Sequence, residues 1–347
     1  MIYNCIDLFS GCGGLSEGMH RAGFQIIFAV ENNPDAVATY RMNHPESVVI
    51  EKDIRKIRIS EILKKLNNKP LHFLAGCPPC QGFSSVRRLN KKRNVRDNRN
   101  SLIKEYLRFV KGLKPLTIMM ENVSGLVNYY LFKDMTRKLE KFGYNIDYRV
   151  VNLKDYGVPQ RRRRLVLVGS LLGKIKTAEA IKRKVTVRDA IAHLEPIAET
   201  DDPVHKIVAK HQENILEMIK LLPKDGGSRK DLPKKYLLKC HRAKNVGFND
   251  VYGRLRWDDF ASTITGGCLN PSKGRFLHPE ENRALTAREA ALLQSFPRTY
   301  KFPVTISKTS LALLVGNALP PQFSYIQACN IKNHLDEYSL CRVKNGR

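Results

Sequence analysis

The stretch IYNCIDLFSGCGGLSEGMHRAGFQIIFAVE, residues 2–31, decides the fold class of this chain. An apolar run, Ile2–Phe9, leads into a glycine-rich turn, an amphipathic segment over Leu15–Ala22 and a second apolar run over Gln25–Glu31. Two strands joined through a helix run parallel in a sheet, because a parallel pair needs a crossover connection. The stretch therefore predicts the first βαβ unit of a doubly wound sheet.

The same alternation continues to about residue 170. Further strands are expected at Ser47–Ile50, Leu71–Gly76, Leu116–Glu121, Asn145–Asn152 and Leu165–Gly169, and helices at Ala36–Met42, Glu61–Leu66, Ser101–Leu113 and Lys133–Phe142. We therefore predict an α/β fold with a doubly wound, mostly parallel sheet. Near the end, Thr286 and Glu289 form a capping-box pattern ahead of one helix, and a second helix is expected over Gln322–His334.

Between these regions the alternation of strands and helices breaks down. Residues 206–244 hold eleven Lys or Arg against four Asp or Glu, and proline and glycine interrupt the segment. We expect a catalytic and cofactor-binding domain over 1–175 and a smaller, basic, inserted domain over 176–284. The segment 285–347 is expected to return and complete the first domain.

The charge of the chain narrows the class of partner. Its 60 Lys and Arg against 33 Asp and Glu give a net charge of +27, and so basic a surface attracts polyanions, nucleic acid first among them. Charge alone does not separate this interpretation from a merely lysine-rich surface. No apolar run approaches the roughly 18 residues of a membrane span, and the start lacks the pattern of a secretory signal. We expect a cytoplasmic protein without a membrane partner.

The cysteines favour a reducing compartment and no metal site. Eight of them are scattered along the chain, unlike the framework of a small disulfide-rich protein. Only Cys77 and Cys80 form a CxxC pair, and no second pair or histidine motif completes a zinc site.

Two motifs carry candidate chemistry at strand ends. The glycine cluster after the first strand, with Glu31 twenty residues beyond Gly11, fits either a nucleotide-like ligand or a plain turn; the third glycine of G-x-G-x-x-G is replaced by Ser16. In GCPPCQGFS, residues 76–84, Cys80 follows two prolines that stiffen its turn. On its own, this motif fits a nucleophile, a redox pair or a buried structural cysteine.

The motifs in order resemble the cytosine-C5 DNA methyltransferase family, in its bacterial modification-methylase form. The resemblance spans nearly the whole chain, through DLFSGCGG, EN, DI, GCPPCQGFS, ENV, QRRRR, LTAREAALLQSFP and GNALPP. It implies an S-adenosylmethionine-dependent methyltransferase fold with the insert as target-recognition domain. It also implies methyl transfer to C5 of a flipped-out cytosine in a specific duplex sequence.

Catalytic and cofactor roles follow from the resemblance. Cys80 matches the nucleophile that adds to cytosine C6, Glu121 matches the carboxylate that binds the ring, and Arg162 and Arg164 match arginines that hold cytosine O2 and brace Glu121. The resemblance assigns the S-adenosylmethionine site to Phe9, Gly11, Gly13, Glu31, Asn32, Asp53, Ile54, Pro79 and Asn317. Asn32 departs from the aromatic residue that stacks on adenine in many family members, so Ile54 is one candidate for that contact.

DNA contacts are expected in two segments. The run 86–100 holds seven basic residues and one acid, and a loop over 84–100 could close over the extruded base. We expect DNA contacts at Ser84, Ser85, Arg87, Arg88, Arg229, Arg242 and Arg256, with Arg254 among further candidate base readers. A monomer and a pairing with a restriction endonuclease are also expected.

Three other functions are alternatives to DNA methylation. Methylation of tRNA on the same fold predicts a smaller recognition region than the roughly 120 residues between QRRRR and LTAREA. A catalytically inactive DNA-binding protein is opposed by the intact Cys80, Glu121 and arginines. A nicotinamide dehydrogenase is opposed by the missing third glycine and the Pro-Cys turn.

Overall fold

The computed structural model describes residues 2–67, 69–79, 102–237 and 250–344, which form two compact units. The first unit comprises Met1–Asn152, Arg163–Ile181 and Leu319–Arg347, and the second comprises Leu153–Arg162 and Lys182–Ala318. Residues 285–318 thus lie in the second unit, whereas we expected them to complete the first domain. The expected boundaries after residues 175 and 284 stay a prediction.

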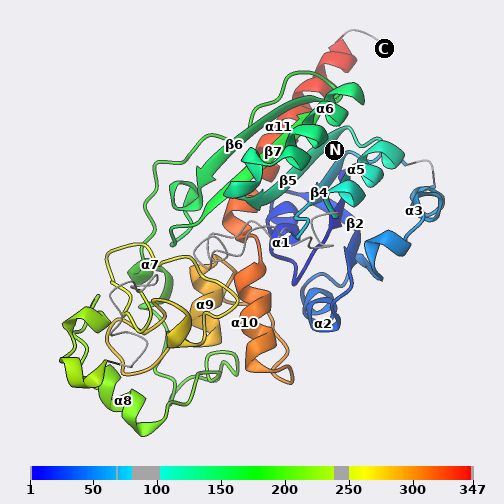
Figure 1. Ribbon diagram of the computed structural model, residues 1–347. Coiled ribbons are helices and arrows are strands. Elements are labelled where there is room, and N and C mark those ends of the chain that lie inside the picture. The colour runs from blue at the N-terminus through cyan, green and yellow to red at the C-terminus, as the bar shows by residue number, and fades with distance from the viewer. Residues whose placement is uncertain (1, 68, 80–101, 238–249, 345–347) are drawn as a thin grey trace. The chain divides into compact units, whose positions relative to one another are not determined.

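A seven-stranded sheet forms the centre of the first unit (Figure 1). Its strands are β1 (Tyr3–Leu8), β2 (Phe24–Glu31), β3 (Val48–Glu51), β4 (Phe73–Gly76), β5 (Thr117–Val123), β6 (Asn145–Asn152) and β7 (Arg163–Ser170). Their order is β3-β2-β1-β4-β5-β7-β6. The expected strands match these to within two residues at each end, and the predicted mostly parallel α/β fold is confirmed.

One strand, β7, runs against the others. It pairs antiparallel with both β5 and β6, whereas the pairs among β1 to β5 are parallel. Only ten residues, 153–162, join β6 to β7, and they include the short turn η5 (Leu153–Tyr156). A parallel connection needs a longer crossover, so this link can only turn the chain back as a hairpin.

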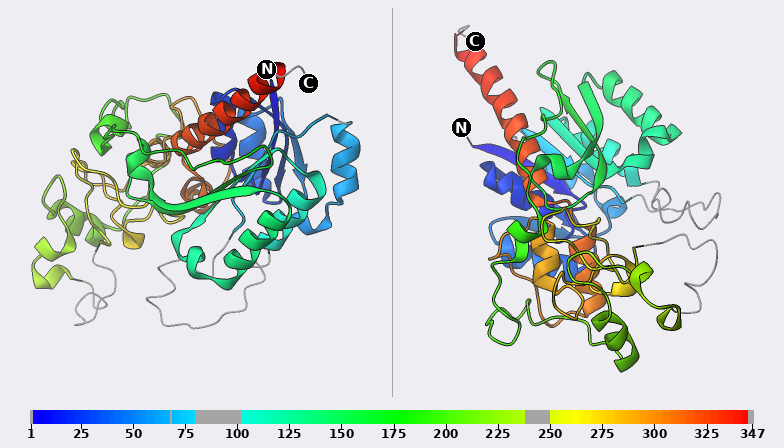
Figure 2. Two further views of the ribbon diagram at one scale, coloured as in Figure 1. Left: turned by 90° about the horizontal axis from the view of Figure 1, so that it is seen from above. Right: turned by 90° about the vertical axis from the view of Figure 1, so that its left-hand side faces the viewer.

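Helices cover both faces of the sheet (Figures 1 and 2). The helices of the first unit are α1 (Gly14–Arg21), α2 (Pro34–Asn43), α3 (Ile59–Leu66), α5 (Leu102–Leu113), α6 (Tyr130–Lys141) and α11 (Pro321–Lys344), with the short turns η1 (Ile54–Lys56) and η4 (Ser124–Asn128). Apolar side chains of α3, α5 and α6 form one core with alternate residues of β1, β4, β5 and β7. Figure 2 shows the start of β1 and the far end of α11 on the same side, where the Tyr3 hydroxyl donates to Asp336 Oδ1 at 2.7 Å.

The packing of α1 against α11 depends on a glycine. A Cβ atom built on Gly18 would lie 2.4 Å from the Cβ of Ser324, so no larger residue fits there without a shift of one helix. The Ser324 hydroxyl donates to the carbonyl of Leu15 at 2.6 Å across this close approach. α11 begins at the second proline of the pair 320–321, which suits the first turn of a helix, and extends ten residues beyond the expected end at His334.

The second unit has little regular structure. Its helices are α7 (Val187–Ile191), α8 (Glu213–Lys220), α9 (Ala287–Leu293) and α10 (Lys308–Asn317), with short turns η6 (Arg229–Asp231), η7 (Lys234–Tyr236) and η9 (Pro271–Lys273). The capping box predicted for Thr286 and Glu289 is present at the start of α9. No helix in the described ranges is both long and apolar enough to cross a membrane.

Candidate active site

The glycine-rich loop between β1 and α1 adopts a backbone that depends on glycine. Gly11 has φ +55° and Gly13 φ +94°, both in the left-handed region, and Phe9 also has φ +60°. A Cβ atom built on Gly11 would meet no atom within 4 Å. The backbone of this loop is therefore open to close approach by a ligand.

Glu31 lies at the end of the neighbouring strand β2 and contacts this loop. Its Oε2 accepts a hydrogen bond from the main-chain N–H of Gly11 at 2.9 Å, and its Oε1 accepts from the N–H groups of Asn32 and Asn33, each at 2.8 Å. A carboxylate has about four lone-pair positions, so these three hydrogen bonds leave Oε2 able to accept one more, from a hydroxyl of a ribose. The loop and Glu31 thus fit the sugar of a nucleoside cofactor.

The residues expected to contact adenine differ in how far they are exposed. The Nε–H of Arg55 is shared between the two oxygens of Asp53, at 2.9 Å from Oδ1 and 3.1 Å from Oδ2. This neighbour lowers the pKa of Asp53 to about 2, so the carboxylate is ionised and accepts hydrogen bonds at any working pH. Ile54 is buried in the apolar core of the first unit. Asn32 is exposed and Pro79 half-buried, and their contacts with a cofactor stay predictions.

Behind the loop, three buried polar side chains form a series of hydrogen bonds that the sequence analysis does not predict. The Ser16 hydroxyl donates to Asp7 Oδ2 at 2.7 Å and lies 2.8 Å from the Tyr40 hydroxyl, and all three side chains are fully buried. Burial raises the pKa of Asp7 to about 8. Among the described residues, Asp7 Oδ1 and Ser10 Oγ are buried without a hydrogen-bond partner. Unpaired polar atoms at this loop favour a polar ligand.

Glu121 and Arg164 meet at the ends of β5 and β7. Arg164 is paired with Val123 in the register of the two strands, and its Nε lies 2.8 Å from Glu121 Oε1. Glu121 is only 8% exposed, so this ion pair is largely shielded from water. The expected nucleophile Cys80 lies outside the described residues, four positions after the end of β4.

Arg162 and Asn317 belong to the second unit. Arg162 is buried, and its guanidinium donates to the carbonyls of Ile264 at 2.8 Å and Gly316 at 3.2 Å. Asn317, at the end of α10, is exposed. Arg162 therefore holds the main chain next to Asn317 in place. The expected contact of Arg162 with cytosine O2 stays a prediction.

Of the residues expected to contact DNA, the structure describes Arg229 and Arg256. Ser84, Ser85, Arg87, Arg88 and Arg242 lie outside the described residues. Arg256 is exposed, whereas Arg229 is 5% exposed, so its side chain does not face solvent in this conformation. Their roles as DNA contacts stay predictions.

Arg254 is fully buried, and the hypothesis that it reads a base does not hold. Its guanidinium donates to the carbonyls of Ile219, Leu222, His278 and Glu281 and to Asn282 Oδ1. No carboxylate contributes to this set. The side chain therefore holds loops of the second unit together.

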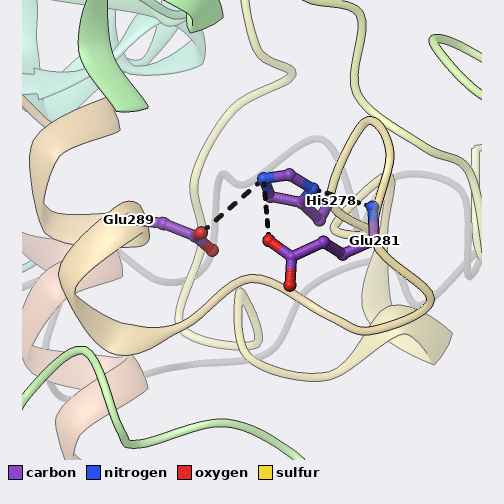
Figure 3. Close-up of side chains that lie close together, drawn as sticks. All are labelled: His278, Glu281 and Glu289. Atoms are coloured by element: carbon purple, nitrogen blue, oxygen red, sulfur yellow. Dashed lines mark hydrogen bonds and ion pairs between the residues drawn. The ribbon is translucent and has the colours of Figure 1, made fainter. Parts of the chain in front are cut away.

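One cluster in the second unit has a composition that could hold a metal ion. The ligand atoms of His278, Glu281 and Glu289 lie within 4.8 Å of one another (Figure 3). Arg283 already donates to both carboxylates, at 2.7 Å to each Oε1, and His278 Nδ1 accepts from the N–H groups of Glu280 and Glu281. The cluster is a partly buried ion-pair network, with Glu281 exposed, in which a guanidinium supplies the positive charge.

Comparisons with known proteins agree with this geometry. Residues 3–333 match the family described as C-5 cytosine-specific DNA methylase. The chain is 33% identical to the type II methylase M.HgiDII of Herpetosiphon aurantiacus over 97% of both chains, and 34% identical to the type II methyltransferase M1.HphI of Haemophilus parahaemolyticus over 91% of this chain and 83% of that one. The crystal structure of a prophage-encoded Escherichia coli protein superimposes with a TM-score of 0.74 at 25% identity, covering 96% of this chain and 99% of that one.

The fold and the site thus define a methyltransferase. More particularly, the chain belongs to the C-5 cytosine-specific DNA methylase family, and its activity is DNA (cytosine-5-)-methyltransferase. The predicted family, fold and enzyme class are confirmed. The family uses S-adenosylmethionine as methyl donor and DNA as substrate.

Proposed function

We propose that this enzyme methylates cytosine in a specific duplex DNA sequence through a covalent adduct between Cys80 and C6 of the flipped-out base. The observation that carries this proposal is the shielded Glu121–Arg164 pair. Glu121 lies on β5, the neighbour of β4, and the chain continues from β4 through Pro78 and Pro79 to Cys80. A carboxylate that lies on the strand next to β4 and is held by an arginine supports the proposal.

We propose that S-adenosylmethionine binds at the glycine-rich loop. Glu31 would bind the ribose through the acceptor position left on Oε2, the ionised Asp53 would accept from the adenine amine, and the open backbone at Gly11 leaves room for the ligand. When bound, the cofactor supplies a methyl group on a sulfonium, which is an electrophile. Phe9, Gly13, Asn32, Ile54, Pro79 and Asn317 are the remaining proposed contacts.

The residues of the chain then make cytosine reactive. Carbon C5 is a weak nucleophile until the Cys80 thiolate bonds to C6 and shifts electron density to C5. Glu121, held by Arg164, binds N3 and the exocyclic amine and assists proton transfer to the ring during this addition. After C5 has gained the methyl group, loss of the C5 proton expels the Cys80 thiolate and restores the aromatic ring. Arg162 is proposed to contact O2 of the same base.

Sequence choice is proposed to lie in the 176–284 segment. Reading base edges needs side chains in the major groove, and the exposed Arg256 and the basic stretch 206–244 offer such groups. The chemistry itself needs only the flipped base, the cofactor and the Cys80 pocket. We further propose a monomer that acts on bacterial cytoplasmic DNA together with a restriction endonuclease, on the ground that its relatives include type II methylases.

Trapping of the adduct tests the chemistry. A duplex library with 5-fluorocytosine, incubated with enzyme and S-adenosylmethionine, should give a complex that survives denaturant, because fluorine cannot leave C5 as a proton does. Cys80→Ala should abolish the complex. A complex that persists in this variant, or whose linked peptide contains Cys77 alone, would refute the assignment.

The role of Glu121 needs a separate measurement. Glu121→Gln should keep DNA affinity and slow the single-turnover methylation rate by roughly 10²–10⁴, the usual size of general acid–base assistance. Arg161→Gln is a suitable control, because Arg161 pairs with Asp259 of the second unit and not with Glu121. A Glu121→Gln enzyme with the wild-type rate would remove Glu121 from the mechanism.

A further inference from the structure

Cys77, the first cysteine of the CxxC pair, lies beside Glu121. It follows directly on β4, and the parallel pairing of β4 with β5 places Gly76 opposite Met120, so that Cys77 and Glu121 are the next residues on the two chains. The main-chain N–H of Cys77 donates to the carbonyl of Leu8 at 3.3 Å and fixes this position to β1. Facing residues of neighbouring strands point to the same side of a sheet, so the register places the Cys77 thiol and the Glu121 carboxylate side by side.

Glu121 thus has a donor on each side. In the order of the sheet, β5 lies between β4 and β7. Arg164 approaches Glu121 from β7, with its Nε 2.8 Å from Oε1, and Cys77 occupies the facing position just beyond the end of β4. A carboxylate held by donors from two neighbouring strands has fewer orientations available than one held by a single arginine.

The segment that carries the thiol is itself held in place. Asn122, the residue after Glu121, is buried and donates from Nδ2 to the carbonyl of Pro78 at 2.8 Å. Asn122 Oδ1 accepts from the N–H of Val123 at 2.8 Å, which fixes the direction of the amide. The Cys77–Pro78 segment and the Glu121–Asn122 strand end are therefore linked by the Asn122 side-chain amide.

The protonation state of the thiol suits a donor. Burial raises the pKa of Cys77 well above its usual value, and the neighbouring Glu121 and Asp7 add to this effect. A protonated thiol donates a weak hydrogen bond and is a poor nucleophile. The two cysteines of the pair would therefore have opposite tasks, with Cys77 as hydrogen-bond donor and Cys80 as nucleophile.

We propose that Cys77 is a positioning residue, which donates a hydrogen bond to Glu121 and, together with Arg164, fixes the orientation of this carboxylate toward the cytosine ring. This inference rests on the proposed role of Glu121. It uses a side chain that the sequence motif alone leaves as a structural or redox cysteine.

Paired substitutions test the inference. Cys77→Ala removes the donor and should lower kcat about 10-fold, the effect of one hydrogen bond to a charged group, while KM for DNA changes less than about twofold. Cys77→Ser restores a donor and should return kcat to within about threefold of wild type. Cys5→Ala is the matched control: Cys5 is a fully buried thiol on β1, so its loss should lower the melting temperature and leave kcat unchanged.

The outcomes separate the possibilities. Wild-type kcat in Cys77→Ala, or equal losses in the Ala and Ser variants, would overturn the positioning role, because packing would then explain any effect. If Cys77→Ala does not fold, Cys77→Thr against Cys77→Val makes the same comparison at nearly equal volume. Failure of wild-type enzyme to form the 5-fluorocytosine adduct would instead refute the proposed function, whatever these variants show.

Discussion

The two units of this molecule are stabilised by different means. In the first unit, apolar residues of a seven-stranded sheet pack against α3, α5 and α6 in one extensive core. In the second unit, one apolar cluster consists of six buried side chains around α8, and buried polar side chains tie the loops together. Besides Arg254, two examples are Gln160, which donates to the carbonyl of Leu293 at 2.9 Å, and Arg288, which donates to the carbonyl of Tyr300 at 2.8 Å.

This difference has a physical consequence. Apolar packing tolerates many substitutions of similar volume, whereas a buried guanidinium leaves several carbonyls without donors once it is removed. Removal of such a guanidinium should therefore destabilise the second unit more than a volume-conserving apolar substitution destabilises the core of the first unit.

The largest expected effect is at Arg254. Arg254→Met keeps most of the volume but leaves four main-chain carbonyls without this donor, so we expect a loss of about 5 kcal/mol of stability in the second unit. Urea denaturation with limited proteolysis should show cleavage within 182–318 well before the first unit unfolds. Simultaneous unfolding of both units at the wild-type midpoint would contradict the comparison.

Asp7 gives the first unit a dependence on alkaline pH. Its pKa is raised to about 8 in the folded state, so between roughly pH 4 and 8 the unfolded chain loses this proton first and stability falls as pH rises. Each pH unit costs up to about 1.4 kcal/mol, so Asp7→Asn should gain up to about 4 kcal/mol relative to wild type between pH 5 and pH 8. Urea midpoints at the two pH values measure this gain, and a constant difference between variant and wild type would contradict the raised pKa.

Glu289 gives the second unit the opposite dependence. Burial acts to raise its pKa, but hydrogen bonds from Arg283 outweigh burial and hold the pKa below its usual value. The stabilisation is present above the unfolded pKa and is lost as pH falls through the folded one. Glu289→Gln should therefore cost about 3 kcal/mol at pH 7 and progressively less toward pH 3. A pH-independent cost, measured by the same denaturation, would rule out this ion pair as the cause.

The smallest effect on stability is expected at Arg256. Its side chain is exposed, so Arg256→Ala should change stability by no more than about 0.5 kcal/mol, in contrast to its neighbour Arg254. If Arg256 contacts a phosphate, the slope of log K for duplex DNA against log salt should decrease by about 0.9. An unchanged slope would leave Arg256 as a solvated charge.

The sequence by itself determined the strands, the fold class and the family. Strands such as β1 and β2 can be predicted from the sequence, because a short apolar run between a turn and a helix has few conformations other than a strand. The family is predictable because the motifs DLFSGCGG, GCPPCQGFS and ENV each lie at the end of a strand. Helices α7, α8 and α10 are absent from the sequence prediction. α7 is only five residues long, and α10 is apolar on most sides and shows no helical stripe.

Only the tertiary structure decided which polar groups are buried and what they contact. Arg254 and Arg256 are two residues apart in a basic segment, yet one is fully buried and the other exposed. In the same way, burial raises the pKa values of Asp7 and Cys77, and Glu121 meets Arg164 through the pairing of β5 with β7. The local sequence pattern shows how apolar residues recur and so indicates helices and strands. The burial of a charged side chain and the partners it contacts depend instead on which loops and strands the whole chain brings together.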